Sequence, residues 1–230
     1  MKIEILHLLE GAKAAQGLTV IIDVFRAFST ACYIAEKNPD AIIPVSSVEE
    51  ALNLRNKFDD VVVIGEVQGK QVEGFDFGNS PAHIQGYNFA GKTVIHRSSS
   101  GTQGLVFSQK ADEVITGSFV NAEAIVRYIK QKNPQQVSLV CMGWACEYES
   151  EEDTFCAEYI KSLLEEEEYL VDDKIERLKQ TDGKRFFLPE NQQSEPEEDF
   201  YLSTKLNRFD FVLKVKSHNN DLIQLEKIEV

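Results

Sequence analysis

A carboxylate and a guanidinium stand three residues apart at the end of an apolar run. Residues 18–22 lack polar alternation, and all but Leu18 are β-branched, which is typical of a strand buried on both faces. Asp23 follows this run, and a helical pattern begins just after Arg26. Because ligands bind at the carboxyl ends of strands in open α/β sheets, this turn suits an anion handled through a metal. The alternative is an internal ion pair that fixes the turn.

Two further strand ends carry carboxylates. Glu66 follows the apolar run 61–64, and Glu152 with Asp153 follows a later one. If the strands are parallel, their carboxyl ends share one edge of the sheet, so these groups can meet Asp23 in one cleft. Carboxylate oxygens suit a hard cation such as magnesium, which leaves positions for water and substrate oxygens.

A serine-rich turn follows the strand predicted at 93–96. It begins with Arg97 and continues through Ser98, Ser99, Ser100, Gly101 and Thr102. Hydroxyls and helix N-terminal amides at such a turn suit a phosphate, sulfonate or carboxylate. Simple helix capping explains the same composition equally well.

Several familiar motifs are missing from the sequence. It has no G-x-x-x-x-G-K-[ST] loop, no G-x-G-x-x-G after a strand and no G-x-S-x-G, which disfavours P-loop, dinucleotide and α/β-hydrolase sites. Asp23 is followed by Val24 and Phe25, so the D-x-D pattern of haloacid-dehalogenase-type phosphatases is absent. Cys141 has Glu147, not arginine, six residues later, which disfavours a cysteine phosphatase.

Charge and composition narrow the partners. A net charge of −14 argues against non-specific binding to nucleic acid or to an anionic membrane, although a local cationic pocket can still hold a small anion. The longest apolar runs fall short of the roughly 20 residues that a membrane span needs. The first residues lack the features of a signal peptide, and the four cysteines form no C-x-x-C pair. We therefore expect a cytoplasmic protein with reduced, buried thiols.

Strand and helix patterns alternate along the chain, which predicts an α/β fold with a largely parallel sheet and helices on both faces. Ser47 and Glu50 have capping-box spacing, and Ser80-Pro81 predicts the start of a short helix. After about residue 165 the composition becomes polar, which indicates an exposed helix and loop up to residue 199. A β-hairpin with its turn at 218–221 should follow. We expect a single domain over 1–230, with a core at about 1–165 and a C-terminal extension at about 166–230.

Five segments resemble, in order, the motifs of the 2-phosphosulfolactate phosphatase family. They are 23–27 (DVFRA), 65–66 (GE), 74–81 (GFDFGNSP), 117–121 (GSFVN) and 152–157 (EDTFCA). The eight-residue segment is highly specific. The resemblance implies a three-layer α/β/α sandwich with a mixed, largely parallel sheet. It also implies hydrolysis of 2-phosphosulfolactate to sulfolactate and phosphate, with magnesium as cofactor. In some archaea this reaction is a step of coenzyme M biosynthesis. The resemblance further implies a homodimer.

The resemblance gives the candidate residues their roles. As magnesium ligands it suggests Asp23, Glu66 and Asp153, with Glu152 as a further candidate. Asp23, Arg26 and Glu66 become the catalytic candidates. The substrate-binding candidates are Arg97, Ser99, Ser100, Gly101, Thr102 and Asn79. The residues leave open whether water or Asp23 attacks the phosphorus.

Three positions depart from the family pattern. Ser100 stands where the family has asparagine, Val67 where it has arginine, and Glu158 where it commonly has glycine. These departures motivate an alternative substrate, another small phosphorylated hydroxy acid. A non-catalytic binder of a small anion and a hydrolase with Cys141 or Cys146 as nucleophile are the other hypotheses.

Overall fold

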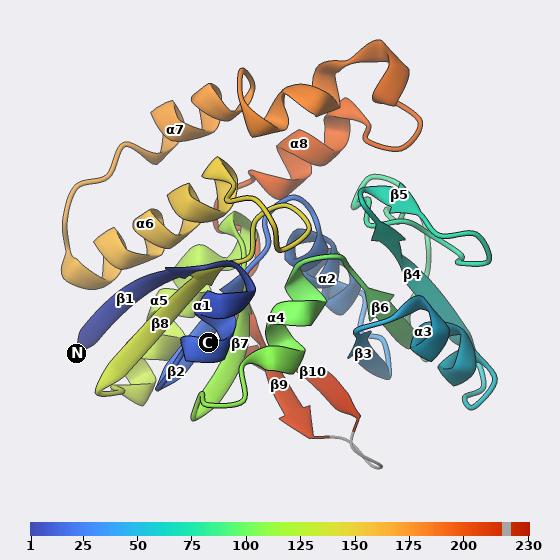
Figure 1. The fold of residues 1–230 in the computed structure, drawn as a ribbon, viewed down its shortest axis with the longest axis horizontal. Helices are drawn as coiled ribbons and strands as arrows, with labels where there is room; N and C mark the ends of the chain where they lie inside the picture. The colour runs from blue at the N-terminus through green and yellow to red at the C-terminus, as the bar shows by residue number, and fades with distance from the viewer. Residues whose placement is uncertain (218–221) are drawn as a thin grey trace.

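The strands of the protein form two sheets. The computed structural model describes residues 1–217 and 222–230, shown in Figure 1. In the described chain the larger sheet contains, in spatial order, β1 (Lys2–His7), β8 (Gln136–Cys141), β2 (Leu18–Ile22), β7 (Glu113–Gly117), β9 (Phe211–Ser217) and β10 (Ile223–Glu229). The smaller sheet contains β3 (Ala41–Val45), β6 (Thr93–Arg97), β4 (Val61–Val67) and β5 (Lys70–Gln71).

The central strands of both sheets are parallel. β1, β8, β2 and β7 pair in parallel, as do β3, β6 and β4. The later strand β9 joins β7 antiparallel, β10 joins β9 in the same way, and β5 pairs antiparallel with β4. The mixed, largely parallel α/β architecture is therefore confirmed, with its strands divided between two sheets. The predicted hairpin is β9–β10, and its predicted turn at 218–221 lies outside the described residues.

Helices connect most of the strands. They are α1 (Leu8–Ala14), α2 (Ala27–Glu36), α3 (Val48–Arg55), α4 (Gly101–Phe107), α5 (Ala122–Lys132), α6 (Glu151–Glu165), α7 (Val171–Leu178) and α8 (Glu197–Ser203). Short 3-10 helices add η1 (Phe119–Asn121), η2 (Asp182–Phe187) and η3 (Pro189–Asn191). The N-cap predicted for α3 is confirmed, because the Glu50 amide donates to Ser47 Oγ at 3.1 Å. The Glu50 side chain does not complete a capping box, since it accepts from the Ser46 amide at 3.1 Å. No helix among the described residues combines the length and apolar character needed to cross a bilayer.

Alternating side chains of the strands enter different core clusters. In β2, Val20 and Ile22 pack with the residues of α5 and α6, whereas Ile21 packs with those of α2 and α4 on the opposite face. In β3, Ile42 belongs to the cluster of α2, and Ile43 packs against α3. Both faces of the parallel strands are thus covered by helices, which explains their uninterrupted apolar composition.

The segment after residue 165 only partly matches its prediction. The four glutamates at 165–168 are exposed, as expected for a solvated charge run. The prediction that the rest up to residue 199 is an exposed helix and loop is wrong, because Leu178 and Phe186 are fully buried against the core, as is the neighbouring Phe200. These apolar residues are widely spaced among charged ones, so they show no regular period in the sequence. Figure 1 shows α7 and α8 crossing the sheet end near the loops that follow the parallel strands.

The residues after Ser80 form turns, and the short helix predicted there is absent from the described structure. Ser80 Oγ accepts from the His83 amide at 3.2 Å, as a helix cap would. The same hydroxyl donates to Asp199, which also accepts from the Ala82 amide at 2.9 Å. A distant carboxylate therefore takes the place of the first helical turn.

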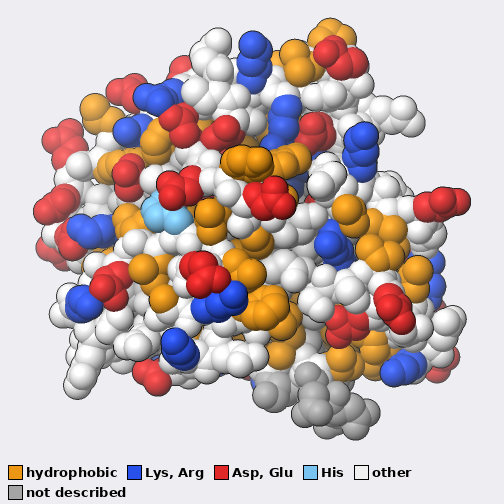
Figure 2. Space-filling model, viewed as in Figure 1, with side chains coloured by type: hydrophobic (Ala, Val, Ile, Leu, Met, Phe, Trp, Pro, Cys, Tyr) orange, Lys and Arg blue, Asp and Glu red, His pale blue; other side chains and the backbone are white. Residues whose placement is uncertain are grey.

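The surface drawn in Figure 2 mixes acidic, basic and hydrophobic side chains over the same face. The negative net charge of the chain is not gathered there into one acidic region. Local groups at the site therefore decide which ligand charge is favoured there.

Candidate active site

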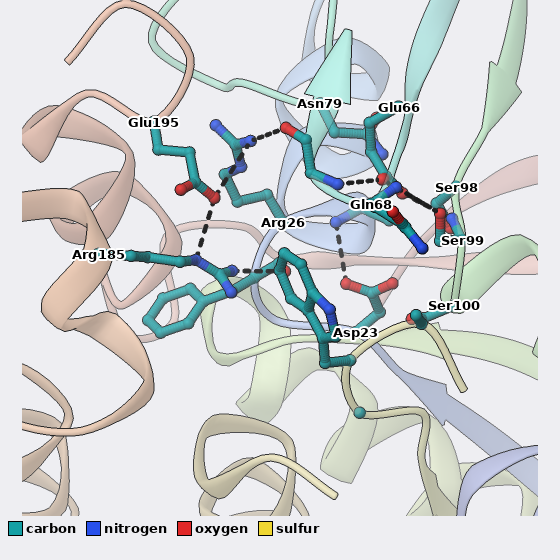
Figure 3. Close-up of a pocket in the computed structure, with 16 residues that line it drawn as sticks. Asp23, Arg26, Glu66, Gln68, Asn79, Ser98, Ser99, Ser100, Arg185 and Glu195 are labelled. Carbon is teal, nitrogen blue, oxygen red and sulfur yellow. Dashed lines mark hydrogen bonds and ion pairs between the residues drawn. The ribbon is translucent and has the colours of Figure 1, made fainter. Parts of the chain in front are cut away.

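A cavity lies at the carboxyl ends of the parallel strands, where the open-sheet rule expects a ligand site. Its lining includes Asp23 after β2, Glu66 in β4, Ser98 after β6 and Gly143 in the loop after β8. Figure 3 shows Asp23 and Glu66 on the same side of this cavity, beside the serine turn. Of the residues predicted from the sequence, the cavity brings together Asp23, Arg26, Glu66, Asn79, Ser99 and Ser100.

Asp23 is buried and held by two backbone amides. Its Oδ1 accepts from the Ala27 amide at 3.1 Å and its Oδ2 from the Gly101 amide at 2.8 Å. Burial, together with repulsion from Glu66, raises the pKa of Asp23 to about 6, although the two amides oppose this. The carboxyl group is therefore ionised at neutral pH and is destabilised by its surroundings, which a bound cation would relieve.

Gly101 is required by the close approach of α4 to Asp23. A Cβ at this position would lie 2.8 Å from Asp23 Oδ2 and 2.9 Å from Phe28 Cζ. No side chain fits there without moving the carboxylate. Gly101 does not line the cavity itself, so its contribution is the backbone amide that orients Asp23.

Glu66 is held by the serine turn and by the loop after β4. Its Oε1 accepts from the Ser99 amide at 2.6 Å, and its Oε2 accepts from the Gly69 amide at 2.6 Å and from Ser99 Oγ at 3.2 Å. Arg97 fixes the same corner, because its Nη1 donates to the backbone oxygen of Glu66 and to Ser99 Oγ. The Arg97 side chain does not line the cavity, in contrast to the expectation that it holds substrate.

The amides of the serine turn are mostly occupied by the protein itself. The Ser98 amide donates to Thr102 Oγ1 and the Thr102 amide donates to Ser98 Oγ, both at 3.0 Å. Thr102 is fully buried and does not line the cavity, so it caps the turn. With the Ser99 and Gly101 amides given to Glu66 and Asp23, the expected anion cradle holds two carboxylates of the protein. Ser100 lines the cavity, and its hydroxyl makes no cap hydrogen bond to α4.

Arg26 is buried and bound by groups from distant segments. Its Nη1 donates to Asp199 Oδ2 at 2.5 Å and to the Ser194 oxygen at 2.8 Å, and its Nη2 donates to the Gly69 oxygen at 3.4 Å. The alternative interpretation, an ion pair between Asp23 and Arg26, is therefore wrong, because Arg26 pairs with Asp199. Arg26 joins the turn after β2 to the loop after β4 and to the C-terminal extension.

Asn79 lines the cavity and rests on a neutral histidine. Its Nδ2 faces the Arg97 oxygen at 3.5 Å, so its Oδ1 is the acceptor for His96 Nε2 at 2.7 Å. Burial lowers the pKa of His96 to about 4, which keeps the ring uncharged near neutral pH. His96 thus orients Asn79 from inside the core.

Asp153 and Glu152 are buried but do not line the cavity. Asp153 accepts from the Val24 amide with Oδ1 and from the Gly143 amide with Oδ2, both at 2.8 Å. Burial and repulsion from Asp23 raise its pKa to about 8, and burial raises that of Glu152 well above its usual range. Asp153 therefore fixes the two loops that carry Asp23 and Trp144.

Three residues from the C-terminal extension belong to the site, and the sequence analysis missed them. Arg185 and Glu195 line the cavity, and Asp199 binds Arg26 behind it. Charged residues dominate their segment, and this composition predicts an exposed loop. The available signal was the pair Phe186-Phe187 next to Arg185, which is unusual for a solvated loop.

The departures from the family pattern have unequal importance. Val67 is 42% exposed and outside the cavity, and Glu158 lies on α6, where it accepts from Tyr169 Oη at 2.7 Å. Ser100 is the departure that faces the cavity. Burial raises the pKa of Cys146 to about 12 and that of Cys141 well above its usual range, which disfavours either thiol as a nucleophile.

A sequence model of the 2-phosphosulpholactate phosphatase family matches residues 4–218. The chain belongs to this family. A relative from Bacillus subtilis (strain 168) is 30% identical over 206 residues, which cover 88% of this chain and 89% of the relative. One from Carboxydothermus hydrogenoformans is 39% identical over 168 residues, or 73% and 69% of the two chains. Both are named "Probable 2-phosphosulfolactate phosphatase".

Membership of the 2-phosphosulpholactate phosphatase family confirms the resemblance seen in the sequence. The matched residues include both cavity carboxylates and extend through Arg185, Glu195 and Asp199. The C-terminal extension is therefore part of the family's common sequence, and the residues that it adds to the cavity belong with those of the strand ends.

Proposed function

We propose that this protein is a magnesium-dependent phosphatase that hydrolyses 2-phosphosulfolactate to sulfolactate and phosphate. The observation that carries the proposal is the convergence of Asp23 and Glu66 on one cavity beside Ser100. Membership of the 2-phosphosulpholactate phosphatase family supports the substrate, and the names of the two relatives agree with it.

The cavity carboxylates fit a magnesium ion of the kind that phosphate-handling sites use. Magnesium is usually held by one or two carboxylates, with water and substrate phosphate oxygens completing its shell. Asp23 and Glu66 are such a pair, and among the described residues no larger group of His, Cys, Asp or Glu is placed to hold a metal. We therefore assign the ion to Asp23 and Glu66, with Glu152 and Asp153 outside its immediate shell. When bound, magnesium would offset phosphoryl charge and lower the pKa of a water.

The protein's own groups orient the reaction. The Gly101 and Ala27 amides favour the ionised form of Asp23 and fix its carboxylate, and the Ser99 and Gly69 amides fix the carboxylate of Glu66. An ionised Asp23 can accept a proton from an attacking water. The Ser100 hydroxyl is available to donate to a phosphoryl oxygen. Arg26 acts by positioning, since its donors are bound to Asp199 and to backbone oxygens.

A related substrate, another small phosphorylated hydroxy acid, is the second candidate. The cavity-facing Ser100 favours it, because serine offers one short hydroxyl where the family has a longer amide. A comparison of 2-phosphosulfolactate with 2-phospholactate, in the native protein and in Ser100→Asn, separates the two substrates. If Ser100→Asn shifts the preference toward 2-phosphosulfolactate and the native protein prefers 2-phospholactate, the second candidate holds.

Phosphate release from 2-phosphosulfolactate is the direct test of the proposal. We expect turnover with magnesium and its loss after dialysis against a chelator, with recovery when the ion is restored. Calcium, which accepts looser geometry, should restore much less activity. Absence of phosphate release with magnesium would refute the activity, and full turnover in the chelated protein would refute the metal.

Two properties of the whole protein are part of the same proposal. We expect a homodimer, measurable by light scattering during gel filtration, and a cytoplasmic location, measurable by cell fractionation. The strand β1 pairs only with β8 among the described strands, so its outer edge is available for an interface. The link to coenzyme M biosynthesis requires sulfolactate to be consumed in the host.

A further inference from the structure

Of the three arginines near the cavity, Arg185 differs from the other two in what its guanidinium contacts. Arg26 gives both Nη atoms to protein acceptors, and Arg97 lies outside the lining. Arg185 lines the cavity, and its one hydrogen bond among the described residues is from Nη2 to the Phe25 oxygen at 3.3 Å. It is therefore the cation with donors left for a ligand.

Aromatic rings hold this guanidinium in place. It lies 4.6 Å from the centre of the Trp144 ring and 5.0 Å from that of Phe186. Stacking on rings leaves the N–H groups in the guanidinium plane free, which suits forked binding of a carboxylate or sulfonate. The side chain is mostly buried, so its charge is weakly screened.

Glu195 occupies the space in front of Arg185. Its Oε1 is 3.1 Å from Arg185 Nε and 3.9 Å from Arg26 Nη2, and Figure 3 shows Glu195 extending toward both arginines. Although the pair with Arg185 is close, neither Arg185 Nε nor Glu195 Oε1 has a hydrogen bond of good geometry among the described residues. Glu195 also lines the cavity. A carboxylate in this position neutralises the charge of Arg185 but leaves its Nε–H without a well-formed hydrogen bond.

We propose that Arg185 binds an acid group of the substrate other than the phosphate, and that Glu195 occupies the position of this group in the free protein. The inference rests on the proposed function and deepens it. The substrate class is a phosphate monoester with a nearby carboxylate or sulfonate. The incoming acid displaces Glu195 and forms the forked hydrogen bonds that the internal pair lacks.

The placement of Arg185 relative to Asp23 agrees with a two-part ligand. Both groups line one cavity, and the charge of Arg185 slightly opposes the rise that burial causes in the pKa of Asp23. Asp23 and Ser100 follow the parallel strands β2 and β6, whereas Arg185 and Glu195 belong to the C-terminal extension on the other side of the cavity. The phosphate end and the acid end of a ligand thus meet different segments of the chain.

Substrate selectivity in Arg185→Gln tests the proposal. We would compare kcat/KM for 2-phosphosulfolactate, for 2-phospholactate and for 2-phosphoglycerol, which carries its phosphate on the same secondary carbon but has no acid group. The preference for 2-phosphosulfolactate over 2-phosphoglycerol should fall at least about 30-fold, mostly through KM, because one forked charge-assisted contact is lost. The preference for 2-phospholactate over 2-phosphoglycerol identifies the acid group. If Arg185→Gln lowers this preference by the same factor, Arg185 binds the carboxylate. If Arg185→Gln leaves it unchanged, Arg185 binds the sulfonate.

Glu195→Gln should have the opposite effect. Removing the internal carboxylate frees Arg185, so KM for 2-phosphosulfolactate should fall several-fold while KM for 2-phosphoglycerol changes less. A rise in KM for both substrates would show that Glu195 only supports the fold and would overturn its part of the proposal.

Arg177→Gln is the matched control, because Arg177 lies on the neighbouring helix α7 and pairs with Glu151 at the surface. The preference of Arg177→Gln for 2-phosphosulfolactate over 2-phosphoglycerol should stay within about twofold of the native value. Thermal unfolding checks that Arg185→Gln is folded, and Arg185→Lys should restore part of the selectivity. Equal loss of kcat/KM for all three esters in folded Arg185→Gln would overturn the proposal.

Calorimetric binding of sulfolactate separates this inference from the proposed function, since binding needs no turnover. If the native protein binds sulfolactate and Arg185→Gln binds it at least tenfold more weakly, Arg185 is an acid-binding residue even in a protein without phosphatase activity. Equal binding by both proteins would refute the role of Arg185 whatever the outcome for catalysis.

Discussion

Arg26 donates to Asp199 at 2.5 Å across 173 positions of the chain, and both side chains are buried. Asp199 uses its other oxygen to accept from Ser80 Oγ at 2.8 Å and from the Ala82 amide at 2.9 Å. One carboxylate therefore joins the turn after β2 to the end of the 74–81 segment. The most specific motifs of the family meet at a residue that lies outside all of them.

Asp199→Asn should destabilise the protein by about 3 kcal/mol, because removing one partner leaves a buried charge without compensation. Urea denaturation followed by circular dichroism would measure the free energy of unfolding. Asp210→Asn is the control, since Asp210 is 80% exposed and pairs with Arg127 at the surface. It should change the free energy of unfolding by less than about 0.5 kcal/mol. A loss below about 1 kcal/mol in Asp199→Asn would show that the buried pair is unimportant for stability.

Asp23→Asn should lower kcat by at least about 100-fold, because the amide neither holds magnesium well nor accepts a proton. The measurement is phosphate release from 2-phosphosulfolactate at saturating magnesium. Asp112→Asn provides the control, since Asp112 is exposed and precedes β7 at its amino end. Activity of Asp23→Asn within tenfold of the native protein would remove Asp23 from the mechanism.

Gly101→Ala should reduce both stability and activity. The new methyl group would overlap Asp23 Oδ2 and Phe28, which is expected to cost about 1–3 kcal/mol and to displace the carboxylate. The control is Gly86→Ala, because a Cβ at Gly86 meets nothing within 4 Å. Thermal unfolding and kcat would be measured for both variants. Equal behaviour of the two would contradict the tight packing of α4 against Asp23.

The buried His96 should make the protein sensitive to mild acid. Burial lowers its pKa from 6.5 to about 4. Between these two pH values the unfolded chain therefore binds a proton at His96 more readily than the folded protein does. This contribution to stability is complete above pH 6.5 and is lost as the pH falls toward 4. Between pH 7 and pH 5 the loss should be about 2 kcal/mol.

His96→Gln isolates this effect, because glutamine can still donate to Asn79 and does not titrate. The carboxyl groups with raised pKa, such as Asp153, act in the opposite direction but are common to both proteins. Between pH 7 and pH 5 the free energy of unfolding of the native protein should therefore fall by about 2 kcal/mol more than that of His96→Gln. Parallel pH profiles of the two proteins would show that His96 is not buried in its neutral form.

The parts of the fold that local sequence determines were predicted well. The strand at Leu18–Ile22 has the predicted bounds, and the N-cap of α3 at Ser47 and the strands of the final hairpin agree as well. These features depend on neighbours within a few residues. The sequence also predicts that Asp23 and Glu66 meet in one cleft, and both line the cavity. The expected reason, strand ends along one edge of a single sheet, differs from the structure, in which β2 belongs to the larger sheet and β4 to the smaller one.

The partners of the charged side chains could not be predicted in the same way. Arg26 pairs with Asp199, and Asp153 accepts from the Val24 amide, because of packing between segments more than 100 positions apart. Arg185 gave no periodic signal, although it lines the cavity. Sequence patterns identified which residues end a strand, whereas the three-dimensional packing decides what each one faces.

Because Arg26 needs Asp199, which lies near the end of the chain, the parts of the site form in a fixed order during synthesis. When the ribosome has made the chain only through α6, all parallel strands and both cavity carboxylates are present, but Arg26 lacks its carboxylate partner and Arg185 does not yet exist. The turn after β2 must then keep Arg26 hydrated, which prevents its final packing. The sheet can therefore form early, whereas a competent cavity has to wait for translation of α8.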